Sequence, residues 1–166
     1  MGRRLSSRVV RPKMQPHLTV LKLSGFINAA TILDFEQELD SLLLESRMDL
    51  VIDLSDVGYI NSTGISALLT YHQSWRAKGD ELILVRTPRG IGLVLEQFGV
   101  PSVVPVLADE PEAVEFLARA MGGPRQYPTM ADFLEKTARA PLRFSASPPK
   151  HHSGVPARTP PPAPVP

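Results

Sequence analysis

One stretch of twenty residues, Leu50–Leu69 (LVIDLSDVGYINSTGISALL), most limits the folds that are open to this chain. Its first five residues are apolar apart from Asp53, which is the pattern of a strand buried on both faces of a sheet. A polar turn is expected to follow. From Ile65 onward the apolar residues recur three or four positions apart, as they do on one face of a helix. The stretch therefore predicts a strand, a short loop and a helix, in that order.

The loop between these two elements carries amide and hydroxyl side chains, in the tetrapeptide Asn61–Gly64 (NSTG). Asn61 and Ser62 are both good helix-capping residues. The hydroxyls of Ser62 and Thr63 fall where the N–H groups of the first helical turn lack partners, and such a helix terminus also attracts anions. The loop therefore predicts hydroxyl groups at a place where a negative charge is favourable.

Strand and helix patterns alternate through the rest of the chain up to residue 121. Further strands are expected at three places: Leu18–Leu23, Leu82–Val85 and Val103–Val106. Three further helices are expected: Asn28 and Asp109 would each cap one, and Pro88 would open the third. Gly79 is expected to stop the central helix in the left-handed conformation, and Pro105 places the last strand at a sheet edge. Alternation of this kind predicts an α/β fold with helices packed on a parallel or mixed sheet.

Length and charge indicate one folded domain between two basic ends. The 166 residues have a formal net charge of +1, but only basic charges precede Asp34 and only basic charges follow Glu135. We assign residues 1–16 to a basic N-terminal arm, 17–121 to the domain, and 122–166 to a Pro-rich, mostly disordered tail with a short helical pattern at 130–138. The basic ends are interpreted as solubilising, and contact with nucleic acid or anionic lipid is the alternative.

The residue types exclude several classes of protein. The chain has no cysteine, so disulfides, thiolate nucleophiles and cysteine-bound metals cannot form. No apolar run reaches the length of about 20 residues that a membrane helix needs. No membrane insertion is therefore expected, and the protein is expected in the cytoplasm.

Candidate catalytic groups are few and scattered. His72 falls on the core-facing side of the central helix, where we favour a structural role over that of a general base. Asp53 and Asp56 form a carboxylate pair without further catalytic groups around it, and Gly90–Gly92 (GIG) lacks the rest of a phosphate-binding loop. The pair His151–His152 is either a weak metal site or an ordinary part of the tail. We expect no enzyme activity, no cofactor, no metal site and no small-molecule ligand.

Three segments of this chain, in their order and spacing, resemble the STAS domain of bacterial anti-sigma factor antagonists. They read VLKLSGFIN (20–28), VIDLSDVGYINSTGISALL (51–69) and GDELILV with GIGLVLEQFGV (79–85 and 90–100). The resemblance runs from Leu18 to Ala120. It implies a STAS-type sandwich, in which a mixed sheet of about four to five strands packs with about four helices.

The resemblance also implies a binding protein that is controlled by phosphorylation. It places the phosphoacceptor at Thr63, with Ser62 as the alternative, and the partner-binding surface at five residues: Asn28, Asn61, Ser62, Thr63 and Gly64. The implied partners are an anti-sigma factor that is also a serine/threonine kinase, and a phosphatase that resets the system. Unmodified protein would bind the anti-sigma factor and release a sigma factor. Asn28 and Asn61 stand where the family often has Asp, so the loop geometry is expected to hold while its charge differs.

A second function is compatible with the same resemblance. The chain would then be a phosphorylation-independent STAS adaptor, either in a stress-signalling scaffold or in a lipid-transporting ABC system. Genomic neighbours separate the two functions, because a kinase-type anti-sigma factor indicates the first, whereas an ATPase with a permease indicates the second.

Overall fold

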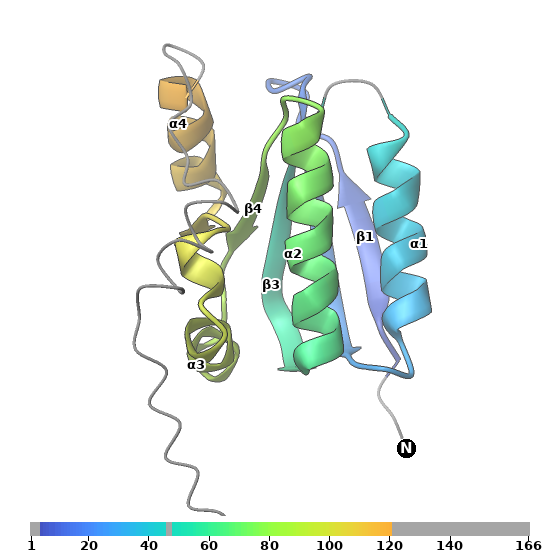
Figure 1. Cartoon of the computed structure of the whole chain (residues 1–166). Coiled ribbons are helices and arrows are strands. Elements are labelled where there is room, and N and C mark those ends of the chain that lie inside the picture. The colour runs from blue at the N-terminus through green and yellow to red at the C-terminus, as the bar shows by residue number, and fades with distance from the viewer. Residues whose placement is uncertain (1–3, 46–47, 121–166) are drawn as a thin grey trace, which may run out of the picture.

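Five strands form one mixed sheet in the computed structural model of the protein, which describes residues 4–45 and 48–120 (Figure 1). In sheet order, which is also chain order, they are β1 (Ser6–Val10), β2 (Leu18–Ile27), β3 (Asp49–Ile60), β4 (Leu82–Val85) and β5 (Val106–Leu107). The pair β1–β2 is antiparallel, and β2 to β5 are parallel to one another. The predicted mixed sheet is confirmed.

Helices cover both faces of the sheet. They are α1 (Ile32–Leu43), α2 (Ser62–Ala77), α3 (Arg89–Gln97) and α4 (Glu110–Ala120), with a 3-10 turn at Val100–Ser102. The larger buried cluster joins one face of the sheet to α1, α2 and α3, and a smaller cluster joins the other face to α4. Figure 1 shows α1 and α2 side by side across the sheet. Because both faces are covered, the strands have nearly continuous apolar runs, such as the fully buried Leu82–Val85.

The strand β3 is much longer than predicted. It continues from Leu54 through Ile60, over residues that the sequence pattern assigned to a polar turn. Two register shifts in the β2–β3 pairing interrupt the regular alternation of side chains, one between Lys22 and Ser24 and the other between Gly25 and Phe26. Extra residues of this kind hide a strand from a search for period-two patterns, because polar and apolar positions no longer alternate.

Two other boundaries also differ from the predictions. The segment Ser6–Val10, predicted as part of a basic arm that ends at residue 16, forms β1 and pairs with β2 from Ser24 to Val20, so the sheet begins before residue 17. The predicted last strand lies at the edge of the sheet as expected, but its bounds are Val106–Leu107 rather than Val103–Val106, because a 3-10 turn occupies the preceding residues. Prolines at 101 and 105 cannot donate to a ladder, which limits pairing in this region.

Several helix ends agree with the sequence signals. Asp109 caps α4 by accepting a hydrogen bond from the Glu112 N–H at 3.0 Å. Gly79 follows α2 with φ of +82°, as a left-handed helix stop requires. Pro88, expected as the first residue of its helix, is instead the N-cap of α3, which begins at Arg89. None of the helices in the described ranges is long and apolar enough to cross a membrane. The predicted tail at 122–166, with its helical pattern at 130–138 and His151–His152, lies outside the described residues.

Candidate functional site

The carboxyl ends of β2 and β3 bring the predicted site residues to one edge of the sheet. Ile27 of β2 pairs with Ile60 of β3, so Asn28 and Asn61 each follow one member of this pair. The Asn61 N–H donates to the Ile27 carbonyl at 3.2 Å. We call the surface formed by Asn28 and Asn61–Gly64 the α2 edge.

Asn61 is the N-cap of α2. It has extended backbone angles, and its Oδ1 atom accepts a hydrogen bond from the Gly64 N–H at 3.2 Å. This geometry satisfies one of the four N–H groups that lack partners at a helix start. The predicted cap at Asn61 is confirmed, whereas the interpretation of Ser62 as the cap is wrong because Ser62 is already the first helical residue.

The two hydroxyl residues of the α2 edge lie in the first turn of α2 and are exposed. Ser62 and Thr63 are the first and second residues of the helix. The first turn contains no acidic residue, so nothing within it opposes a negative charge. The arrangement can therefore accept an anionic group on either hydroxyl, stabilised by the positive end of the helix dipole.

Asn28 belongs to the α2 edge but does not cap a helix. Its Oδ1 atom accepts from the Ala30 N–H at 2.9 Å, which closes a local turn, and α1 starts only after Thr31. Thr31 fixes this turn, because its hydroxyl donates to the Phe26 carbonyl at 2.7 Å and accepts from the Asn28 N–H at 3.1 Å. The predicted cap at Asn28 is therefore wrong, because the asparagine satisfies its own turn instead.

Gly64 is buried under the start of α2. A Cβ atom built on it would lie 2.6 Å from Ile27 Cγ2 and 2.9 Å from Ile60 Cγ1. Real Cβ atoms do not come this close to other atoms, so only glycine fits here, and α2 packs directly on the ends of β2 and β3. Packing within the domain is sufficient to explain the glycine.

A partly exposed aromatic pair lies next to the α2 edge and was missed by the sequence analysis. The rings of Phe26 and Tyr59 have their centroids 5.8 Å apart, and Tyr59 is 48% exposed. Exposed tyrosine is typical of protein-binding surfaces, because it offers a large apolar face together with a polar tip. The signal that could have revealed this pair was Tyr59 itself, an aromatic residue in a segment that was predicted to be a polar turn.

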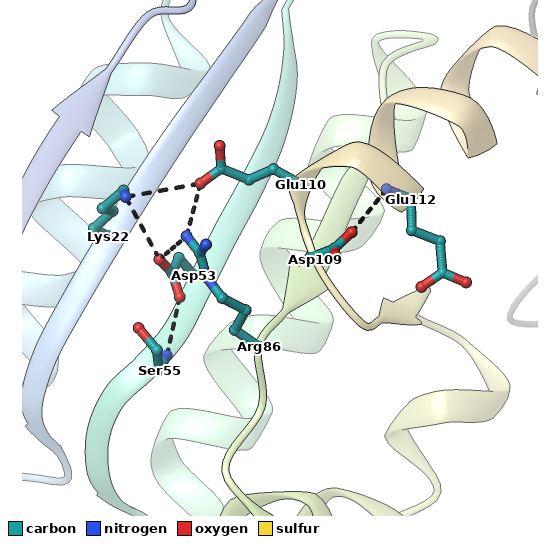
Figure 2. Close-up of polar contacts among 7 residues, drawn as sticks. All are labelled: Lys22, Asp53, Ser55, Arg86, Asp109, Glu110 and Glu112. Carbon is teal, nitrogen blue, oxygen red and sulfur yellow. Dashed lines mark hydrogen bonds and ion pairs between the residues drawn. The ribbon is translucent and has the colours of Figure 1, made fainter.

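A polar network lies on the α4 side of the sheet, and Asp53 is at its centre (Figure 2). Arg86 Nη2 lies 2.5 Å from Asp53 Oδ2 and 2.7 Å from Glu110 Oε1. Lys22 Nζ is farther away, at 4.0 Å from the same Asp53 oxygen and 3.8 Å from the same Glu110 oxygen. Asp56 is exposed and takes no part, so the two aspartates do not form a catalytic pair. The network instead ties the start of α4 to β2, to β3 and to the residue that follows β4.

The environment of Asp53 keeps its carboxylate ionised. Burial alone would raise its pKa, but hydrogen bonds from Arg86 and from the Ser55 N–H, at 3.0 Å, outweigh burial and hold the pKa below its usual value. The hydrogen bond to Asp53 in turn raises the pKa of Arg86. Arg86 also has a φ of +50°, the one positive value among the described residues other than glycine, so the ion pairs offset an unfavourable backbone conformation.

Replacing Asp53 with asparagine is expected to lower the free energy of unfolding at pH 7 by about 1 kcal/mol, since Arg86 is partly solvated. Because the pKa of Asp53 is lower in the folded state, ionised Asp53 stabilises the protein at pH values above its unfolded-state pKa of about 3.9. This stabilisation is lost as the pH falls through the folded-state pKa. The difference between the two proteins should therefore shrink below about pH 4. Urea unfolding at pH 7 and pH 3 measures this, and a constant difference would contradict it.

His72 has the environment of a structural residue. Its Nε2 atom lies 3.1 Å from Glu81 Oε1, and both side chains are 2% exposed. Nine residues separate it from Thr63 along α2, which places it more than two turns away from the α2 edge. Within residues 4–45 and 48–120, no group of three or more His, Cys, Asp or Glu residues is arranged to hold a metal ion.

Known structures of similar fold come from several proteins. An anti-sigma factor antagonist from Mycobacterium paratuberculosis is 21% identical, with a TM-score of 0.60 over 67% of this chain and 92% of that one. SpoIIAA in its unphosphorylated form is 14% identical, with a TM-score of 0.56 over 72% of this chain and 100% of SpoIIAA. The phosphorylated form of SpoIIAA, from Bacillus, is 13% identical, with a TM-score of 0.52 over 68% of this chain and 99% of SpoIIAA. The murine anion transporter Slc26a9 is 19% identical, with a TM-score of 0.54 over 69% of this chain but 22% of the transporter.

These likenesses show a shared fold, and a family model places the chain more closely. A comparison with curated proteins finds no significant match. The model of the STAS domain matches residues 10–113, which spans β2 to the first residues of α4 and includes the whole α2 edge. The chain belongs to the STAS domain family.

Proposed function

We propose that this protein is an anti-sigma factor antagonist of the cytoplasm, controlled by phosphorylation of Thr63. The unmodified α2 edge would bind an anti-sigma factor of the serine/threonine kinase type, which would then release a sigma factor. Phosphorylation by that kinase would end the complex, and a phosphatase would reset it. The observation that carries this proposal is the exposed Thr63 hydroxyl in the first turn of α2, at the edge formed by β2 and β3.

The known relatives support this choice. The M. paratuberculosis protein is named an anti-sigma factor antagonist, and SpoIIAA has been solved in unphosphorylated and phosphorylated forms. Exposed Tyr59, packed against the partly buried Phe26, offers apolar contact area beside the hydroxyls. The role is one of binding, and the enzyme in the cycle is the partner.

The physical chemistry of the α2 edge suits a switch. A phosphate adds about −1.5 to −2 charges, and the helix start stabilises such a group by roughly 0.3–1 kcal/mol, so the fold should survive modification. A partner with a carboxylate about 4 Å away would be repelled by roughly 4 kcal/mol at an effective dielectric constant near 20. That energy corresponds to a loss of more than two decades in affinity.

Replacing Thr63 with glutamate is expected to weaken binding to the cognate kinase-type anti-sigma factor by about tenfold or more, because the new carboxylate imitates part of the phosphate charge. Isothermal titration calorimetry with the purified partner measures the affinity, and circular dichroism should show an unchanged fold. Thr70→Glu is the matched control, since Thr70 is exposed on the same helix, two turns further on. Equal binding by wild type and Thr63→Glu would refute the switch.

Ser62 is the alternative phosphoacceptor, since it is exposed in the same turn. Mass spectrometry of the protein isolated from its host distinguishes the two hydroxyls, because fragmentation locates the phosphate on one residue or the other. The Ser62→Ala variant should still be phosphorylated by the kinase, whereas Thr63→Val should not.

A second candidate function is favoured by the absence of acidic residues from the first turn of α2, where the cap is Asn61. A kinase that recognises a nearby carboxylate would find none there. The protein would then be a phosphorylation-independent adaptor in a stress-signalling scaffold or a lipid-transporting ABC system. Copurification with an ATPase and a permease, without phosphate on Thr63, would favour this function over the first.

A further inference from the structure

The strand β3 has an open edge over its second half. It pairs with β4 only from Leu50 to Asp53, opposite Leu82 to Val85. Beyond Asp53 it continues to Ile60, paired with β2 on one side. Within residues 4–45 and 48–120, no strand pairs with its other side there. In a parallel sheet such an edge presents backbone N–H and C=O groups that can accept another strand.

A groove follows this open edge. Its first wall is the strand segment Val57–Ile60, and its second wall is the start of α3, from Pro88 to Val94. It has a volume of about 390 Å³. Ile91 and Val94 supply apolar side chains from the helix, and Tyr59 supplies an aromatic ring from the strand. An open strand edge beside an apolar wall is the arrangement that binds extended peptides by strand addition.

The chain contains a segment with the pattern of a missing strand. Residues Leu142–Ser147 (LRFSAS) alternate strictly between apolar and polar side chains, and they lie between Pro141 and Pro148. Strict alternation over six residues is typical of a strand with one buried face, and the flanking prolines end the run because they lack a donor. The segment follows the last described residue, Ala120, by about twenty residues, so it is joined to the domain that carries the groove.

The intervening chain is long enough for the segment to reach the groove. The 22 positions from Ala120 to Leu142 span at most about 70 Å when extended. The full length of β3, with its 12 residues, is only about 40 Å. Closing a loop of this size is a modest entropic cost, because the cost grows only with the logarithm of its length.

We propose that Leu142–Ser147 binds as an added strand along the open edge of β3, with Leu142 and Phe144 in the groove beside α3. Ile60 lines the groove and immediately precedes Asn61, so the docked segment would lie beside Thr63. It would then compete with a partner for the α2 edge and restrain binding. This regulatory consequence rests on the proposed function, whereas the docking itself does not.

Amide hydrogen exchange of the full-length protein tests the docking without any partner. Backbone amides of Val57–Ile60 that point into the groove are expected to exchange about tenfold or more faster in the double variant Leu142→Asp/Phe144→Asp than in the wild type. The matched control is Val155→Asp/Val165→Asp, which adds the same charge to the same tail outside the segment. Its exchange at Val57–Ile60 should equal that of the wild type.

Two outcomes would overturn the docking. Equal exchange at Val57–Ile60 in all three proteins would show that the segment does not cover the edge. Protection that disappears on dilution of the wild type would show that a second copy occupies the groove instead. The Thr63→Glu experiment is independent of both, so docking and the proposed function can fail separately.

Discussion

Replacing His72 with leucine is expected to lower the free energy of unfolding by about 3–5 kcal/mol, the usual effect of removing one partner from a buried polar pair. Leucine has a volume similar to that of histidine, so little of the loss comes from a cavity. The loss comes from Glu81, whose buried carboxyl group has His72 Nε2 at 3.1 Å as a hydrogen-bond partner. Without that partner a carboxyl group stays buried with its desolvation uncompensated. Urea or thermal unfolding measures the effect.

The double variant His72→Leu/Glu81→Met is the control for this explanation. Replacement of both members of a buried pair by apolar residues of similar volume is often neutral or stabilising. The variant should therefore recover most of the stability lost in His72→Leu. Recovery is expected because the double variant also removes the Glu81 carboxyl group, which the single variant leaves buried without the His72 ring. A double variant as unstable as the single one would show that the pair has no special part in the loss.

Replacing Gly64 with alanine is expected to lower the free energy of unfolding by about 2 kcal/mol, because overpacking of a filled core typically costs 1–3 kcal/mol. The added Cβ would lie 2.6 Å from Ile27 Cγ2, so either the isoleucine or the start of α2 must move. Alanine favours the helix over glycine by about 1 kcal/mol, and the clash must exceed this gain. Chemical unfolding measures the net change.

Gly90→Ala provides the matched control. Gly90 lies in the first turn of α3, and a Cβ atom there would meet nothing within 4 Å. The same substitution should therefore leave the stability unchanged or raise it by up to about 1 kcal/mol. If both variants were equally stabilised, the close packing of α2 on the strand ends would be refuted.

The α2 edge shows how far local patterns carry a prediction of a site. Asn61 was predicted as a cap because a cap depends on residues within one turn, and its hydrogen bond to the Gly64 N–H confirms it. Asn28 has the same side chain, but it closes a turn that Thr31 holds to the Phe26 carbonyl. A capping residue and a turn residue look alike in sequence, because both use the same amide oxygen to accept a backbone N–H. The aromatic pair of Phe26 and Tyr59 depends on strand pairing and was missed for that reason.

The sequence by itself determined the α/β class, the alternation of strands with helices and the position of the central helix between Asn61 and Gly79, because these follow from side-chain periodicity and from residues close together in the chain. Tertiary structure alone decided the length of β3, the entry of β1 into the sheet and the polar network on the α4 side. That network joins four residues, which come from β2, β3, the position directly after β4 and the start of α4: Lys22, Asp53, Arg86 and Glu110. Strand register and ion pairs of this kind depend on contacts between residues far apart in the chain, for which no local pattern exists.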